Sequence, residues 1–225
     1  GYLPVDELKR AGKKYGVTIN QYLVGTFVYA AYKEYMREQP SKVPFRCCVP
    51  VNLRPYYDSH TMKNFFAMVF ATFQPEKESY TFSEILEIVA QNLKEQITPE
   101  NLNNIMSYNV SNEKNWILRA VPLVIKNFVM KQVYGASAKA TSATVTNIGN
   151  IELKEPYRRF VEHFYVTLSM SKGQHMKGGI CSYNGILTFT FSSILTDLSI
   201  QKRFFQTIAK DGVPVAVESN GSYYA

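Results

Sequence analysis

The sequence predicts an α/β domain in which a mixed β-sheet is flanked by helices in two layers, and we expect residues 1–225 to form a single domain. Helical patterns come first, two apolar strands and more helices follow, and several strands and one helix end the chain. Hydrophobic residues make up 46% and charged residues 19%, which is typical of a packed core. Asn184-Gly185, between two apolar runs, is a strong hairpin signal.

Two helices open the chain in this prediction. Residues 5–15 have helical periodicity, and Gly16 ends that run. Thr18 is a suitable N-cap for a second helix that begins at Ile19. The apolar stripe of the second helix consists of Ile19, Tyr22, Leu23, Thr26, Phe27 and Ala30. We therefore expect this helix to bury one face.

Further helices are predicted in the middle of the chain. Residues 81–84 match a capping box, in which Thr and Glu side chains bind free backbone N–H groups at a helix start. Pro99 suits the first position of the next helix. The run 112–134 has helical character, but Pro122 must break or kink it, and we expect Gly135 to close it.

Two apolar runs in the first half predict strands. Residues 45–53 form one of them, and Pro50 indicates that it is interrupted or lies partly at a sheet edge. Residues 65–73 form the other and carry almost no polar side chain. Because such runs are typical of strands buried on both sides, we expect both faces of 65–73 to be covered.

The second half of the chain is rich in strands. We predict strands at 141–147, 160–170, 180–183, 186–192 and 213–218, and a helix at 198–209. Gly178-Gly179 is a turn signal, and we expect the tail from Ser219 to fray. This order of elements indicates a mixed sheet with helices packed on it.

Three of these strands alternate hydroxyl-bearing and apolar side chains. The polar positions are Ser142, Thr144, Thr146, His163, Tyr165, Thr167, Ser169, Thr188, Thr190 and Ser192. A freely solvated face normally carries Lys and Glu, whereas a dry core tolerates few hydroxyl groups without partners. A wet cleft or a substrate tunnel suits these faces, and so does the general preference of Thr for strands, so both interpretations stay open.

Cysteine content and charge limit the class of protein. Cys47 and Cys48 would point to opposite faces of a strand, and with Cys181 they suggest no disulfide and a reducing, cytoplasmic location. The chain has no apolar run long enough for a membrane span and no signal-peptide pattern. The net charge of +7 suits an anionic partner or simply a basic protein, and the scattered Lys and Arg argue against nucleic acid binding.

A self-sufficient catalytic centre is not evident from the residues. His60, His163 and His175 have no second His or Cys at metal-binding spacing. Asp58-Ser59-His60 contains the residue types of a hydrolase triad, but neighbours in sequence rarely converge as one. The motifs of phosphate-binding loops and nucleophile elbows are missing. His163, on a hydroxyl-rich face, is a candidate for ligand contact, although a single His on a sheet is more often structural.

Several short motifs occur in a recognisable order. They are Pro50-Val51-Asn52-Leu53-Arg54, Asn64-Phe65-Phe66, Thr146-Asn147-Ile148-Gly149 and Ser182-Tyr183-Asn184-Gly185-Ile186-Leu187. Together they resemble the second half of alcohol acetyltransferases and condensation domains, in the chloramphenicol acetyltransferase-like superfamily of CoA-dependent acyltransferases. The resemblance extends from about Val17 to Asn220.

The resemblance implies that this chain is the C-terminal lobe of a two-lobed enzyme with the CoA-dependent acyltransferase fold. In that family the substrates meet in a tunnel between the lobes. A His of an H-H-x-x-x-D-G motif on the first lobe takes the proton from an alcohol or amine, which attacks a thioester. We therefore expect acyl-CoA or an acyl-carrier thioester as co-substrate, no covalently bound cofactor, and an N-terminal lobe of the same polypeptide as partner.

The catalytic motif of that family is degenerate in this chain. The run 192–198 occupies its place between a strand and a helix, with Ser192 and Ser193 at the His positions and Asp197 at the Asp position. Serine cannot replace imidazole as a base near neutral pH, so the resemblance assigns no catalytic residue here. Asp197 equally suits a cap for the helix that follows.

The resemblance assigns further roles residue by residue. Arg54 and Asn64 match structural positions that hold a strand and the loop after it. Asn147 lies in a turn that approaches the tunnel, or is a turn Asn selected for its backbone geometry. Ser182 and Tyr183 line the acceptor side, or simply pair strands. The tunnel candidates are thus Thr144, Thr146, Asn147, His163, Tyr165, Ser182 and Tyr183.

Other functions stay open at this point. The chain could be a binding module that kept the fold without chemistry, a half-enzyme with sites between identical copies, or a nucleic-acid binder. Ser192 and Ser193 argue against the second, because each copy would need the motif His. The chain begins with Gly rather than Met, so we expect a fragment, and a missing lobe would leave an apolar patch that favours self-association.

Overall fold

The computed structural model describes residues 1–170 and 173–220. Its elements are β1 (Tyr2–Pro4), α1 (Val5–Lys14), α2 (Ile19–Glu34), β2 (Phe45–Asn52), α3 (Arg54–Tyr57), β3 (Phe66–Phe73), α4 (Phe82–Gln96), α5 (Pro99–Lys114), α6 (Trp116–Ala120), α7 (Leu123–Lys139), β4 (Ala143–Asn150), the 3-10 helix η1 (Tyr157–Phe160), β5 (Met176–Tyr183), β6 (Ile186–Ser193) and α8 (Ser199–Lys210). The tail from 221 onwards, where we expected fraying, lies outside the described residues.

The strands of the described residues form one six-stranded sheet in the order β1-β6-β5-β4-β2-β3. Strand β4 runs parallel to its neighbours β2 and β5, and the other pairs are antiparallel. The predicted mixed sheet flanked by helices is therefore confirmed. Asn184 and Gly185 form the predicted hairpin turn with φ of 53° and 81°, the left-handed backbone that this turn requires.

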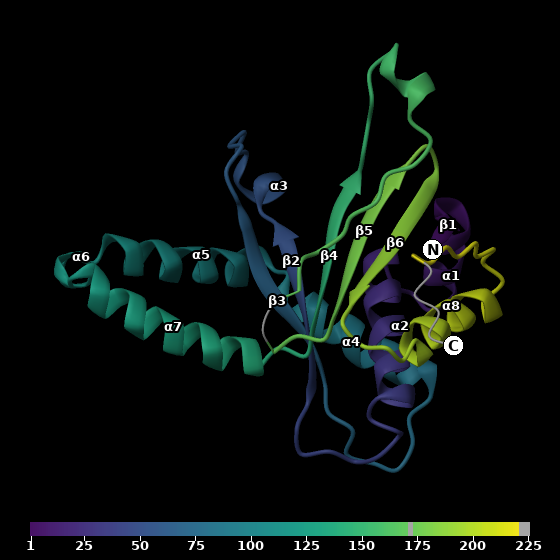
Figure 1. The fold of residues 1–225 in the computed structure, drawn as a ribbon, viewed down its shortest axis with the longest axis horizontal. Helices are drawn as coiled ribbons and strands as arrows, with labels where there is room; N and C mark the ends of the chain where they lie inside the picture. Colours follow the sequence, from purple (N-terminus) through teal and green to yellow (C-terminus); the bar gives the residue numbers. More distant parts are fainter. Residues whose placement is uncertain (171–172, 221–225) are drawn as a thin grey trace.

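One face of the sheet carries the helices α1, α2, α4 and α8 (Figure 1). Helix α2 lies at the centre of this layer and starts with a capping box between Thr18 and Gln21. The predicted capping box of Thr81 and Glu84 starts α4. The core between helices and sheet includes Tyr22, Leu23, Phe27, Ile85, Leu86, Cys47, Val69, Val145, Ile180, Phe189 and Phe204. The hydrophobic core thus lies on one side of the sheet.

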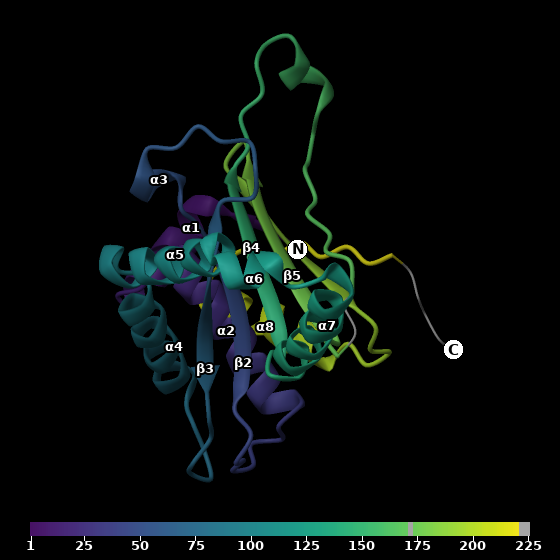
Figure 2. The same ribbon diagram turned by 90° about the vertical axis from the view of Figure 1, so that its left-hand side faces the viewer.

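The helices α5, α6 and α7 form an arm that projects from the opposite face of the sheet (Figure 2). The break that we predicted at Pro122 is confirmed, and a second break occurs at Asn115. The expectation that Gly135 closes the helix is wrong, because α7 continues through it to Lys139. A helix interior tolerates glycine at a cost of about 1 kcal/mol, so one Gly need not end a helix.

Strand β3 differs from the prediction for 65–73. It is the last strand of the sheet, and Phe66 and Met68 are 47% and 54% exposed on the face away from the core. One face of β3 is therefore open. The prediction that both faces of this strand are covered is wrong, because an apolar composition alone does not show that a strand is covered. Strand β2 continues through Pro50 and is not interrupted there. Strand β4 pairs with β2 only at Cys47 and Cys48, so β2 lacks this neighbour at Pro50. The missing N–H of Pro50 therefore removes no hydrogen bond with β4.

Four further segments in or beside the sheet differ from the prediction. Residues 161–170 are extended but belong to no ladder, and 213–218 pair with the sheet only through Ala216, which bridges Tyr2. Strand β1 was not predicted, because three residues are too few for a period-2 pattern. Gly178-Gly179 lies inside β5 rather than in a turn, which makes β5 longer than predicted.

A buried carboxylate joins the end of α8 to the first two helices. Asp211, whose side chain is 8% exposed, accepts hydrogen bonds from Lys14 Nζ, Tyr15 Oη and Tyr22 Oη, each at 2.8 Å. Burial and the hydrogen bond to Asp211 raise the pKa of Tyr22 above its ordinary value. Because folding raises this pKa, the free energy of unfolding should fall as the pH rises beyond about 10, the ordinary tyrosine value.

We predict that Asp211→Ala lowers the free energy of unfolding by about 2 kcal/mol, since it leaves the buried Tyr22 hydroxyl without its acceptor. Urea unfolding monitored by circular dichroism measures this change. Asp6→Ala is the matched control, because the Asp6–Lys9 ion pair is exposed and should contribute less than about 0.5 kcal/mol. Equal unfolding midpoints for the two variants would show that Asp211 does not hold the helices.

Candidate functional site

The face of the sheet away from the core is rich in hydroxyl groups. Thr144 and Thr146 of β4 alternate with the buried Ala143 and Val145, and the register of the sheet places them beside residues 177 and 179 of β5. On the other side of β5, the same face carries Thr188, Thr190 and Ser192 of β6. The two hydroxyl rows predicted for β4 and β6 therefore lie on one face, separated by β5.

Residues 161–170 run across this face on top of β5. The backbone of Val166 lies so close to Gly179 that a Cβ atom there would be 2.0 Å from the Val166 carbonyl oxygen. The Lys177 ammonium group donates a hydrogen bond of 2.8 Å to the carbonyl of Ser169. The segment thus crosses β5 in the antiparallel direction, outside the plane of the sheet. Its predicted alternation holds, but its neighbour is a sheet face rather than a strand edge.

His163 and Tyr165 point away from β5 toward the strand β1. The ring of His163 lies 4.7 Å from the ring of Tyr2, and the hydroxyl groups of Tyr165 and Tyr2 are hydrogen bonded. The Tyr2 hydroxyl also donates to Glu218 at 2.8 Å. The hydrogen bond with Tyr165 contributes most to raising the pKa of Tyr2. These residues form one polar cluster at the β1 edge of the sheet.

Thr144 and Thr146 lie on the other side of the 161–170 segment, toward β2. Both are half-buried. The alternation of β2 and β3 places Arg46 and Phe70 on the same face, where the guanidinium group lies 4.6 Å from the ring centre. The structure therefore divides the predicted tunnel candidates into two groups, with a threonine row that shares its face with Lys177 of β5 and Arg46 of β2, and a tyrosine–histidine cluster at the far edge.

The remaining tunnel candidates are not part of either group. Asn147 lies on the same face of β4 as Val145, contacts Asn20 of α2 through side-chain atoms 3.5 Å apart, and accepts a hydrogen bond from the Gly149 N–H. Ser182 donates a hydrogen bond of 3.3 Å to Asn150 at the end of the sheet. The Asn147 side chain thus binds the backbone N–H two residues on, as turn Asn side chains often do, although Asn147 itself lies within β4.

Tyr183 is buried against the segment that crosses the sheet. Its ring contacts the ring of Phe164 at 5.1 Å, and its hydroxyl donates to the carbonyl of Arg158 at 3.4 Å. Only 6% of Tyr183 is exposed. In this structure Tyr183 therefore fixes the crossing segment on the sheet.

The degenerate motif residues all make structural hydrogen bonds. Ser192 Oγ accepts from the Leu168 N–H at 3.1 Å, and Ser193 Oγ accepts from the Leu195 N–H at 3.0 Å. Asp197 accepts from the backbone N–H of Ser199 at the start of α8, which lowers the Asp197 pKa. Ser192 thus ties down the crossing segment, and Asp197 binds the backbone at the start of α8, where Leu198 is the N-cap residue.

Arg54 holds the loop that leads into β3. Its guanidinium group donates to the carbonyl of Thr61 at 3.0 and 2.9 Å and to that of Lys63 at 2.7 Å. Asn64 is exposed in the same loop. Ser59, in the same loop, accepts a hydrogen bond from the Thr61 N–H. Among the described residues, no group of three His, Cys, Asp or Glu could hold a metal ion.

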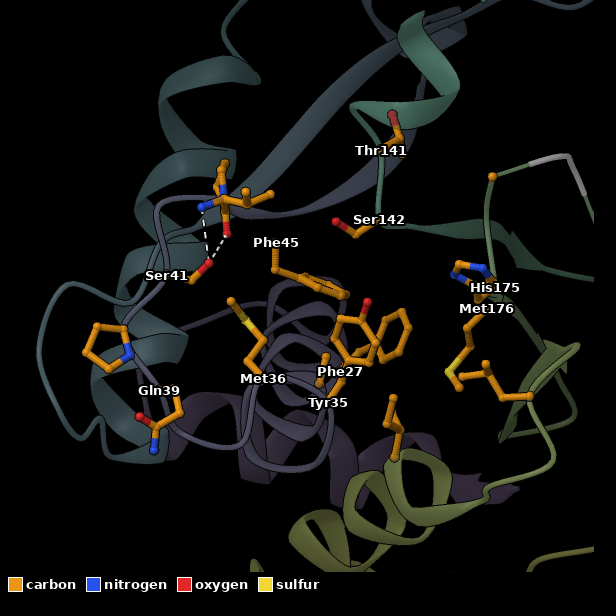
Figure 3. A pocket seen from close by; sticks show the side chains of 17 residues that line it. Phe27, Tyr35, Met36, Gln39, Ser41, Phe45, Thr141, Ser142, His175 and Met176 are labelled. Carbon is orange, nitrogen blue, oxygen red and sulfur yellow. Dashed lines mark hydrogen bonds between the residues drawn. The ribbon is translucent and has the colours of Figure 1, made fainter. Parts of the chain in front are cut away.

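A cavity of about 520 Å³ lies at the end of the sheet where β2 and β4 begin (Figure 3). Its walls come from α2 and the loop after it, from the starts of β2, β4 and β5, and from the loop before α8. Sequence analysis missed this cavity, because no periodic pattern connects walls that come from such separate segments.

Comparison with known proteins finds likeness in structure only. No protein-family model matches the chain, and no curated protein matches it. Among solved structures, 94% of the chain superposes on the nonribosomal peptide synthetase FmoA3 (TM-score 0.59, 16% identity, 21% of that chain). The same share superposes on the wax ester synthase/diacylglycerol acyltransferase from Marinobacter aquaeolei VT8 (TM-score 0.57, 13% identity, 47% of that chain). It also superposes on the cyclization-docking bidomain of EpoB from Sorangium cellulosum (TM-score 0.59, 13% identity, 40% of that chain).

The fold is that of the condensation-domain and CoA-dependent acyltransferase type. The chain spans between about a fifth and a half of the length of these three structures. None of the helices in the described part of the chain is long and apolar enough to cross a membrane.

We predict that Gly179→Ala displaces the crossing segment, because its new methyl group has no room beside the Val166 carbonyl. Overpacking of this kind lowers the free energy of unfolding by about 1–3 kcal/mol. Hydrogen exchange of the Leu168 amide, which is bound to Ser192, should become faster.

Gly135→Ala is the matched control, because a Cβ atom there meets nothing within 4 Å and the position lies in a helix. It should leave the Leu168 amide protected and stabilise the protein by up to about 1 kcal/mol. Unchanged exchange at Leu168 in Gly179→Ala would contradict the placement of the crossing segment.

Proposed function

We propose that this chain is the second lobe of an acyltransferase that moves an acyl group from a thioester to an alcohol or amine. The observation that carries the proposal is the fold match over 94% of this chain but less than half of each of the three similar structures described above. Two of those proteins are named as a peptide synthetase and an acyltransferase. The missing part of such an enzyme would be a first lobe that carries the catalytic His.

The half-buried threonine row supports a role for this face of the sheet as a wall of the substrate site. Thr144 and Thr146 offer hydroxyl groups that can donate to or accept from an uncharged substrate, and Arg46 and Lys177 carry positive charges on the same face. In the proposed reaction, a His from the first lobe removes the proton of the acceptor, and the acceptor oxygen or nitrogen attacks the thioester carbonyl. This chain contributes binding and orientation rather than a base.

The motif position of this chain carries no base, which supports the assignment of the base to the first lobe and of substrate binding to this chain. Ser192, Ser193 and Asp197 are each engaged by a backbone N–H, so these side chains are occupied in holding the crossing segment and α8. The same observation favours a second candidate function, a binding module that kept the fold without chemistry. The two candidates differ in whether the natural polypeptide includes a first lobe with an intact motif His.

The test is an acyl-transfer assay of the natural polypeptide with acyl-CoA and alcohols of increasing chain length. We expect transfer that falls about 10²–10⁴-fold when the motif His of the first lobe is changed to Ala. Thr146→Val in this chain should raise KM for the alcohol several-fold with little change in kcat, because it removes a binding hydroxyl and no reacting group.

Thr196→Val is the matched control, because Thr196 is exposed in the loop before α8, away from the threonine row. It should leave both kinetic constants unchanged. Full activity of the His→Ala variant would refute the mechanism. A polypeptide with an intact His and no transfer activity would favour the binding module.

A further inference from the structure

The cavity at the end of the sheet is lined by side chains that are largely fixed by the core. Phe27, Phe45 and Met176 are 1%, 8% and 4% exposed, and the Phe27 and Phe45 rings meet edge to face with centres 6.1 Å apart. Met36 and Leu195 complete the apolar walls. The rim is formed by more exposed residues of the loop after α2. The cavity is therefore preformed, as small-molecule sites usually are.

Among the described residues that line this cavity there is no Lys, Arg, Asp or Glu, although 19% of the chain is charged, and the exposed His175 is the lining side chain that can carry a positive charge. A ligand carboxylate or phosphate would find no Lys or Arg among these residues and would lose its hydration against the buried Phe27, Phe45 and Met176. An uncharged ligand avoids this penalty. The volume of about 520 Å³ lies within the range of about 300–1,000 Å³ that is usual for small-molecule sites.

Polar atoms border one side of the cavity. Ser142 Oγ accepts a hydrogen bond of 3.1 Å from the backbone N–H of Arg46. This bond does not use the hydroxyl proton of Ser142, which can therefore be donated to a ligand. Thr141 donates its hydroxyl proton to the carbonyl of Ser137 at 3.2 Å and keeps its oxygen as an acceptor. Figure 3 shows the Ser142 hydroxyl directed into the space beside the Phe45 ring. The Ser142 hydroxyl thus offers a donor next to the apolar walls.

We propose that this cavity binds the unbranched alkyl chain of a neutral molecule that carries a hydroxyl or ester oxygen at one end. The alkyl chain lies between Phe27, Phe45 and Met176, and the oxygen meets Ser142. Burial of methylene groups supplies the affinity, at about 0.8 kcal/mol for each group. This site does not depend on acyl transfer, because no reacting group takes part in the binding.

The helix α7 is the competing apolar surface. Leu123, Val124 and Phe128 are 70%, 81% and 65% exposed, so an apolar molecule could also adsorb there. Substitutions in the cavity wall and on α7 show at which of the two sites the ligand binds. Met36→Glu places a carboxylate in the cavity wall, Leu195→Trp fills the cavity, and Val124→Glu places the same carboxylate on α7.

The experiment uses the 225-residue chain and measures how 1-decanol, methyl decanoate and decanoate displace the neutral dye Nile red. We expect displacement by the alcohol, the ester or both, and about tenfold weaker displacement by decanoate. Met36→Glu and Leu195→Trp should each raise the dissociation constant of the neutral ligand about tenfold, which corresponds to about 1.4 kcal/mol. Val124→Glu should leave it unchanged.

Displacement by the alcohol alone would support a hydroxyl ligand, and displacement by both would support the alkyl chain with either oxygen group. Equal affinity for decanoate, or weakening only in Val124→Glu, would overturn the proposal, as would affinities that none of the substitutions changes. If a cavity variant does not fold, a diazirine analogue of decanol is photo-crosslinked to the unchanged chain. Label on Met36, Phe45 or Met176 then supports the site, and label confined to residues 116–134 overturns it.

Discussion

Two adjacent glycines in the middle of β5 determine what can lie on each face of the sheet. A Cβ atom at Gly178 would be 2.7 Å from the ring of Phe189 on the core side, and one at Gly179 would be 2.0 Å from the Val166 carbonyl on the other side. The first glycine allows the core to pack tightly, and the second allows residues 161–170 to lie directly on the strand. That segment in turn separates the threonine row of β4 from the tyrosine–histidine cluster at the β1 edge.

The sequence predicted well wherever the decisive interactions are local. Capping boxes join residues three positions apart, and the turn at Asn184-Gly185 depends on left-handed backbone angles that these two residue types favour. The alternation of 141–147 and 186–192 was also sufficient to assign Thr144 and Thr190 to a face, because the period of a strand leaves only two choices.

The errors come from contacts between distant segments. The alternation of 160–170 is the same whether the segment joins a sheet or crosses its face, and the space at Gly179 decides between them. An apolar strand suggested cover on both faces, yet Met68 in β3 is exposed, and so is Val124 in α7. Exposed apolar side chains on the face away from the core are consistent with a second lobe that packs there. The cavity could not be predicted at all, since its walls come from separate segments.

The proposal that this chain is a second lobe depends on the natural length of the polypeptide. Intact mass spectrometry of the protein from its source cells measures this directly. We expect a mass roughly twice that of this 225-residue chain or more, as two domains of this size require. A mass equal to that of this chain would contradict the second-lobe proposal.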